Sequence, residues 1–143
     1  MDREEINNLF SHETNFNNRF IPNYDDLNKV IFSLKEVGKR VVLTQGVWDL
    51  IHEGHAKYLE KAKSYGDILI VGVDSDELTK KRKGPNRPIV PQDERVRMLI
   101  HLRHVDIVTI REAQHGIGDL IRLVKQDVLI TSNSTADFTA RMK

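Results

Sequence analysis

Two histidines flanking a glycine are the residues of this sequence best suited to chemistry. His52 and His55 are three positions apart, and Gly54 lies between them. At a helix start this spacing lets both imidazoles face one ligand, and the unpaired N–H groups and positive dipole end there favour a phosphate. Gly54 lets the backbone come close to that ligand without a Cβ. The pattern predicts a phosphate site where two imidazoles donate hydrogen bonds to charge developing at phosphorus.

The surrounding sequence predicts the elements that hold this loop. β-branched and apolar runs indicate strands at 41–44, 68–73, 105–110 and 128–131, and apolar residues at helical spacing indicate helices at 24–37, 55–65, from Pro91 onward, and at 117–124. Strands separated by helices of about ten residues imply right-handed crossovers and a parallel sheet. Ligands bind such sheets at the carboxyl ends of the strands, near the point where strand order reverses. We therefore expect the site in the loop after Thr44.

Length, charge and composition exclude several classes of protein. The 143 residues fit one domain, and 22 Lys+Arg against 21 Asp+Glu argue against a nucleic-acid partner. The absence of Cys excludes disulfides, thiolate metal sites and a cysteine nucleophile. The longest apolar run, 68–73, is far shorter than the ~20 residues that span a bilayer. The sequence also begins without the pattern of a secretory signal, so we expect no membrane association and a cytoplasmic protein.

Domain organisation is predicted from a change in pattern near Tyr24. Residues 1–23 contain six Asn, and their apolar residues recur at neither helical nor strand spacing, so we expect an arm that packs only locally. Residues 24–143 are expected to form the functional domain.

The segment from Gly46 to His55 resembles the H-x-G-H signature of the cytidylyltransferase-like nucleotidyltransferases. The resemblance runs from Val41 to about Thr131 and includes Ser75-Asp76 after the second strand, a basic loop, and Glu94-Arg95 at a helix start. The segment from Lys83 to Pro88 is most similar to the adenylyltransferase domain that makes ADP-heptose from heptose 1-phosphate. The glycerol-3-phosphate cytidylyltransferases are the next most similar group within the family.

This resemblance implies a Rossmann-like, doubly wound α/β fold and a reaction. The protein would transfer AMP or CMP from ATP or CTP to a sugar 1-phosphate or a similar phosphorylated acceptor, releasing pyrophosphate. His52 and His55 would act in catalysis, and Mg²⁺ would accompany the nucleotide without a dedicated protein metal site. The resemblance assigns nucleotide binding to Gly46, Val47, Trp48, Gly54, Lys57 and Asp76, and binding of the acceptor or of phosphate to Lys80, Lys83, Arg87 and Arg95.

Several of these residues also have a structural interpretation. A basic run such as that from Lys80 to Lys83 is usually a solvated loop, but its position at the end of the second strand favours a role in phosphate binding. Arg95 can simply pair with an acidic neighbour on a surface helix. For Asp49 we favour a cap on backbone N–H groups over catalysis. For Trp48 we favour packing over stacking on a base.

Two further segments that contain histidine give weaker indications of a metal or phosphate site. His101 and His104 lack a third metal ligand at recognisable spacing, so we interpret them as helix-end residues. His115 and Gly116 precede a predicted helix but lack the spacing of a glycine-rich phosphate loop.

The family resemblance weakens after the fourth strand. Relatives usually continue to a fifth strand and a helix that begins with an Ile-Ser-Thr-Thr-like segment, and we do not equate Ser132 to Thr135 with that segment. We therefore expect either a C-terminally truncated enzyme or a regulatory or scaffold module that binds nucleotide without turnover. The missing strand would leave a sheet edge that a partner subunit can cover. The resemblance also implies a homo-oligomer, because relatives commonly dimerise.

Overall fold

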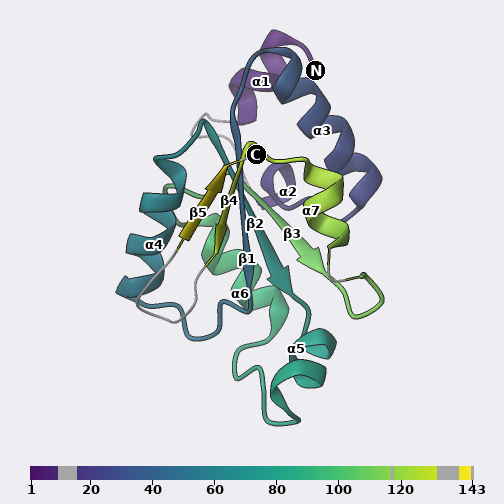
Figure 1. Cartoon of the computed structure of the whole chain (residues 1–143), viewed down its shortest axis with the longest axis vertical. Coiled ribbons are helices and arrows are strands. Elements are labelled where there is room, and N and C mark those ends of the chain that lie inside the picture. Colours follow the sequence, from purple (N-terminus) through teal and green to yellow (C-terminus); the bar gives the residue numbers. More distant parts are fainter. Residues whose placement is uncertain (10–15, 117, 132–138, 143) are drawn as a thin grey trace.

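A computed structural model describes residues 1–9, 16–116, 118–131 and 139–142, and its centre is a five-stranded sheet (Figure 1). The strands lie in the order β3-β2-β1-β4-β5, the first four parallel and β5 antiparallel to β4. Their bounds are β1 (Val41–Gly46), β2 (Ile68–Asp74), β3 (Ile107–Arg111), β4 (Val128–Thr131) and β5 (Thr139–Met142). The predicted doubly wound parallel sheet is confirmed.

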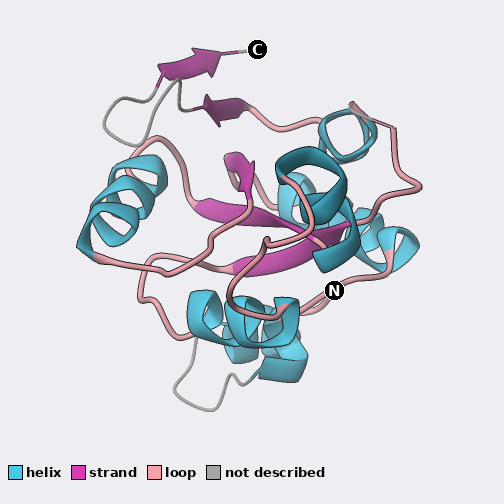
Figure 2. Ribbon diagram, turned by 90° about the horizontal axis from the view of Figure 1, so that it is seen from below, coloured by secondary structure: helices cyan, strands magenta, loops and turns pink. Residues whose placement is uncertain are grey.

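Helices cover both faces of this sheet (Figure 2). They are α1 (Arg3–Leu9), α2 (Phe16–Arg19), α3 (Tyr24–Glu36), α4 (Glu53–Lys63), α5 (Asp76–Lys83), α6 (Gln92–Ile100) and α7 (Asp119–Val124). Apolar residues of α4 and α6 pack on one face, and those of α3 and α7 pack on the other. All seven residues of β2 are buried, as its continuous apolar sequence predicts for a strand covered on both sides.

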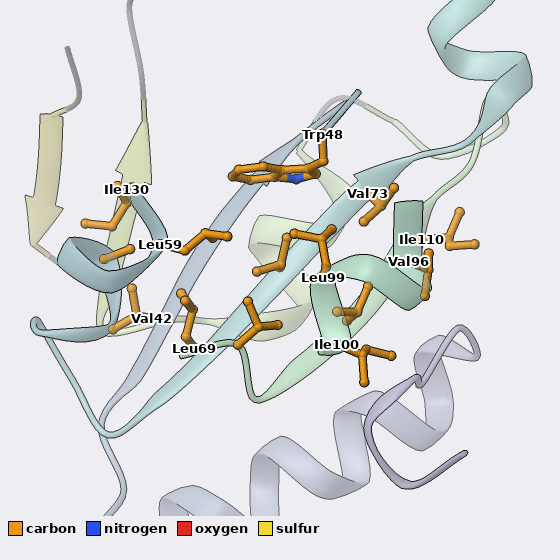
Figure 3. Close-up of a cluster of buried hydrophobic side chains, with 14 of the residues drawn as sticks. Val42, Trp48, Leu59, Leu69, Val73, Val96, Leu99, Ile100, Ile110 and Ile130 are labelled. Atoms are coloured by element: carbon orange, nitrogen blue, oxygen red, sulfur yellow. The ribbon is translucent and has the colours of Figure 1, made fainter. Parts of the chain in front are cut away.

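Alternating side chains along each strand divide the core into two clusters. In β1, Val42 faces α4 and α6, whereas Val41 and Leu43 face α3 and α7. Figure 3 shows the first cluster, where the Trp48 indole lies across one end. The core therefore reaches the loop that follows β1.

Strand order reverses at β1, which pairs with β2 on one side and with β4 on the other. From β1 the chain builds outward through β2 to β3 before it returns to β4. The crevice at the carboxyl end of β1 is thus the expected ligand position, and the His52–His55 loop lies there.

The amino-terminal residues correct one prediction. Phe16 and Phe20 pack against the α4/α6 cluster, and Phe20 forms a parallel bridge with Val108 of β3. The N–H of Ile21 also donates to the Val108 carbonyl oxygen at 2.9 Å. The expectation that residues 1–23 pack only locally is wrong for 16–21, because their aromatic residues cover the apolar side of the β3 edge.

Two more differences concern elements that the sequence did not predict. The basic run expected in a loop is the last turn of α5, and β5 covers the edge of β4 that we had left for a partner subunit. A homo-oligomer remains a prediction, and Ser132 to Thr135 lie outside the described residues. No helix in the described ranges is long and apolar enough to cross a membrane.

Candidate active site

A pocket of about 840 Å³ opens at the carboxyl end of β1. The loop after β1 and the start of α4 form one wall, and residues of α5 and the following loop form the other. Eight of the predicted nucleotide, acceptor and catalytic residues line it: Gly46, Val47, Trp48, His52, Gly54, His55, Lys83 and Arg87. The structure therefore gathers most of the predicted site residues around one cavity.

His52 and His55 hold each other at the start of α4. His52 is the N-cap, its ring Nδ1 accepting from the N–H of Gly54 at 2.9 Å. The Nδ1 of His55 accepts from the N–H of His52 at 3.2 Å. A side chain on Gly54 would place its Cβ 2.7 Å from the His52 ring, so only glycine leaves room for this cap. The helix thus begins at Glu53, two residues before the predicted start.

These two bonds determine which ring nitrogen carries the proton. A backbone N–H only donates, so each Nδ1 must be unprotonated and each neutral ring carries its proton on Nε2. The rings lie 4.2 Å apart between centroids. Burial and the adjacent His52 lower the pKa of His55 below its ordinary 6.5, which keeps this imidazole neutral. The pocket therefore contains two adjacent neutral imidazole N–H donors.

Trp48 supports the histidines from the core side. Its side chain is 7% exposed, and its Nε1 donates to the Gly72 carbonyl oxygen of β2 at 3.1 Å. The indole makes an edge contact with the His55 ring, at 5.7 Å between centroids. Its φ of 61° turns the chain so that the indole enters the core (Figure 3). The packing interpretation of Trp48 is confirmed.

Tyr58 lines the pocket, although our sequence analysis did not select it. It lies three residues after His55 in α4, and helical spacing places such pairs on one face, so this signal was available. Its hydroxyl lies 2.9 Å from Thr44 Oγ1, which donates to the Ile130 carbonyl oxygen at 3.1 Å. Burial raises the pKa of Tyr58, and the Thr44 contact opposes that rise. This network ties the pocket floor to β4.

Asp49 joins the two walls of the pocket. Its carboxylate oxygens accept the N–H groups of Ile89 and Val90 at 2.8 and 2.9 Å, and Arg87 lies 3.7 Å away. Although burial would raise the pKa of Asp49, these N–H groups and the nearby arginines lower it overall. The predicted cap on backbone N–H groups is confirmed, and the capped segment is distant in sequence.

Arg95 lies outside the pocket lining and clamps the segments around it. Its side chain is 1% exposed and donates to the carbonyl oxygens of Val47, Asp74 and Val90 at 2.6–2.8 Å. Its Nη2 also donates to Asp76 Oδ1 at 2.7 Å. Arg95 is therefore buried, and its partners differ from the surface pair that we had considered. With these acceptors engaged, Arg95 and Asp76 position the loop rather than face the cavity.

The predicted cations divide into two groups. Lys83 and Arg87 line the pocket opposite the histidines, whereas Lys57 and Lys80 do not. Lys57 instead pairs with Glu53 at 3.0 Å along an exposed face of α4. The structure thus brings two of these four positive charges to the cavity.

The described residues contain no cluster of three or more His, Cys, Asp or Glu that could hold a metal ion. Asp49 is the carboxylate that lines the pocket, and backbone N–H groups occupy its oxygens. His101 ends α6 and contacts the Arg97 carbonyl oxygen at 2.7 Å, which agrees with its helix-end interpretation.

Comparisons with known proteins agree with this geometry. Residues 43–143 match a family model described as cytidylyltransferase-like. The chain is 43% identical over 119 residues to the bifunctional protein HldE of Aliarcobacter butzleri, covering 83% of this chain and 25% of that protein. It is 39% identical over 137 residues to HldE of Campylobacter fetus, covering 96% of this chain and 28% of that protein.

The chain thus spans about a quarter of the length of the curated relatives it matches. Among solved structures, it is similar to a lipopolysaccharide core biosynthesis protein from Thermoplasma volcanium, with a TM-score of 0.60 and 29% identity. That match covers 70% of this chain and 80% of the other.

Proposed function

Because the chain belongs to the cytidylyltransferase-like family, we propose that it transfers AMP or CMP from ATP or CTP to a sugar 1-phosphate or a similar phosphorylated small molecule. Pyrophosphate is the second product. One observation carries this proposal: the paired neutral imidazoles of His52 and His55 line a cavity whose opposite wall bears Lys83 and Arg87.

The arrangement suits in-line substitution at the α-phosphorus. An oxygen of the acceptor phosphate forms a bond to that phosphorus as the bond to the β-phosphate oxygen breaks, and pyrophosphate leaves with the electron pair. The Nε2–H groups of His52 and His55 donate to the oxygens on which negative charge grows. No covalent enzyme intermediate is required, so catalysis consists of positioning and charge stabilisation.

The two walls of the pocket receive different parts of the substrates. The helix start at His52 holds the triphosphate, while Lys83 and Arg87 hold the acceptor phosphate or the departing pyrophosphate. Backbone groups of Gly46 and Trp48 contact the nucleotide from the floor. For Val47 the N–H serves this purpose, because its carbonyl oxygen accepts from Arg95.

A divalent metal accompanies nucleoside triphosphates in nucleotidyltransferases, and we propose Mg²⁺ here. Mg²⁺ usually keeps several waters and binds phosphate oxygens with few protein ligands. The pocket fits this mode because Asp49, its carboxylate, is occupied by backbone N–H groups. Phosphate oxygens of the nucleotide would then hold the metal, and the bound ion would neutralise part of their charge.

A pyrophosphate-release assay tests the proposal. ATP and CTP are each supplied with a panel of sugar 1-phosphates, and the wild type is compared with His52→Ala. We expect turnover for one nucleotide and one acceptor, with a loss of about 10²-fold or more in the variant, the typical cost of one oxyanion donor. Nucleotide binding without turnover for any acceptor contradicts the enzyme and supports a nucleotide-binding module.

A further inference from the structure

A second, smaller pocket lies across α5 from the first. It measures about 140 Å³ and is lined by Leu78, Arg82, Arg111, His115 and Gly116. These residues come from α5, the end of β3, and the segment before α7 (Figure 1). One water needs only about 10–15 Å³ of such space, so the pocket has room for a group the size of a phosphate.

The two arginines converge on one buried carboxylate. Arg82 Nη1 lies 3.0 Å from Asp74 Oδ2, and Arg111 Nε and Nη2 each lie 2.8 Å from Asp74 Oδ1. Asp74 is 1% exposed and does not line the pocket, so it lies behind the guanidinium groups. These three side chains together carry a formal charge of +1, before the nearby carboxylate of Glu112 is counted.

His115 adds a neutral donor to the same wall. Its Nδ1 accepts from the N–H of Glu112 at 2.9 Å, so its ring proton lies on Nε2. Its ring also stacks on Tyr24, at 4.3 Å between centroids, which restricts the imidazole. Two further carboxylates act on Tyr24 from nearby, those of Glu112 and Asp119, and the latter is paired with Arg122 and the Gly116 N–H.

We propose that this pocket binds the oxyanion of a phosphate monoester, separately from the phosphate site at His52 and His55. Its polar side chains are all hydrogen-bond donors, with Leu78 as an apolar wall. Arginine guanidinium groups bind phosphate in a fork geometry, and Asp74 holds the two forks in place when the pocket is empty.

Helix α5 connects this pocket to the larger one. Thr79 and Lys83 face the larger pocket, while Leu78 and Arg82 face the smaller. The two residues of each pair are four positions apart, so they lie on one face of the helix. The two faces lie about 100° apart around the helix axis. An anion held by Arg82 therefore restrains the helix that presents Lys83 to the proposed acceptor.

Inorganic phosphate tests the site without assuming any reaction. Backbone amide resonances are followed during a phosphate titration of the wild type, Arg82→Gln, and the matched control Arg103→Gln, which removes an exposed charge elsewhere. We expect saturable chemical-shift changes at Leu78 and Gly116. The phosphate affinity that they report should be about tenfold weaker in Arg82→Gln, which is the scale of one charge-assisted hydrogen bond. His115→Phe is a second variant, keeping the ring stacked on Tyr24 while removing the Nε2 donor.

The outcomes are distinct from those for the histidine site. His52→Asn should leave the shifts at Leu78 and Gly116 unchanged, which keeps the two proposals separable. An equal loss of phosphate affinity in Arg82→Gln and Arg103→Gln would overturn the proposal of a second site. Phosphate-induced shifts confined to residues 52–56 would do the same. Steady-state kinetics then test the connection through α5. A higher KM for the acceptor in Arg82→Gln indicates that the second site is coupled to Lys83 in the larger pocket, and an unchanged KM with weakened phosphate binding indicates that it acts independently of the acceptor.

Discussion

The side chain of His52 has two roles, because one ring nitrogen caps α4 and the other is the proposed phosphate donor. His52→Asn separates these roles. Asparagine is among the strongest N-cap residues, so its amide oxygen can accept from the Gly54 N–H while the Nε2 donor is lost. We expect a melting temperature near that of the wild type and a loss of about 10²-fold in kcat.

His52→Ala provides the comparison for that experiment. It removes the cap as well as the donor, so it should lose similar activity and about 1 kcal/mol of unfolding free energy. Thermal unfolding and pyrophosphate release on both variants check this. An asparagine variant with wild-type turnover would show that His52 is only a helix cap.

The lowered pKa of His55 predicts how acid affects stability. Burial and His52 disfavour its imidazolium, so between the folded pKa and 6.5 the unfolded chain binds more protons. The contribution of His55 to the free energy of unfolding should therefore be constant above about pH 7 and decline as the pH falls below 6.5.

Urea denaturation at pH 7.5 and 5.5 measures this contribution. His55→Asn should lose less stability between these pH values than the wild type does. His101→Asn, at the exposed end of α6, is the matched control and should behave like the wild type. An identical pH dependence of stability for all three proteins would contradict the lowered pKa of His55.

At the scale of elements, Arg95 of α6 joins the loop after β1, the end of β2 and the start of α5. Arg95 is buried but its partner Asp76 is 36% exposed, so the loss of this ion pair costs less than the ~3–5 kcal/mol of a fully buried one. Arg95→Met should therefore lower the free energy of unfolding by about 3 kcal/mol, since it also leaves buried carbonyl oxygens without a donor.

Denaturant titration of Arg95→Met beside Arg103→Met makes the measurement specific. Arg103 is exposed, so its substitution should change stability by less than about 0.5 kcal/mol. Comparable losses in the two variants would show that the Arg95 clamp is not needed for folding.

Helix α5 shows why one element escaped the sequence analysis. It has a single buried residue, Thr79, so the apolar spacing that identifies other helices is absent. Its helix signals are local: Ser75 accepts from the Leu78 N–H, two acidic residues follow, and basic residues occupy the last turn. These signals were present in the chain, but the basic run drew the interpretation of a loop.

For the whole molecule, the aromatic residues before α3 belong to the core. Phe20 packs against the α4/α6 cluster and lies 5.1 Å from Phe16 between ring centroids. Because Phe20 is only partly buried, Phe20→Ala should cost about 2 kcal/mol, below the ~3–5 kcal/mol of a fully buried phenylalanine. Phe32→Ala is the matched control, since that side chain is 65% exposed. Equal stability of the two variants would place residues 16–21 outside the cooperative unit.

Local patterns in the chain were enough to anticipate the parallel sheet, the helices with apolar faces and the position of His52 and His55. The helices and the histidine pair depend on residue spacing within one segment, and the sheet depends on the order of strands and helices along the chain; a sequence displays both directly. The contacts that shape the pocket were not accessible in this way. Asp49 accepts N–H groups some forty residues away, and Arg95 meets the Val47 carbonyl oxygen across two elements. A linear pattern carries no record of which distant carbonyl or N–H a side chain will reach, so packing alone selected these partners.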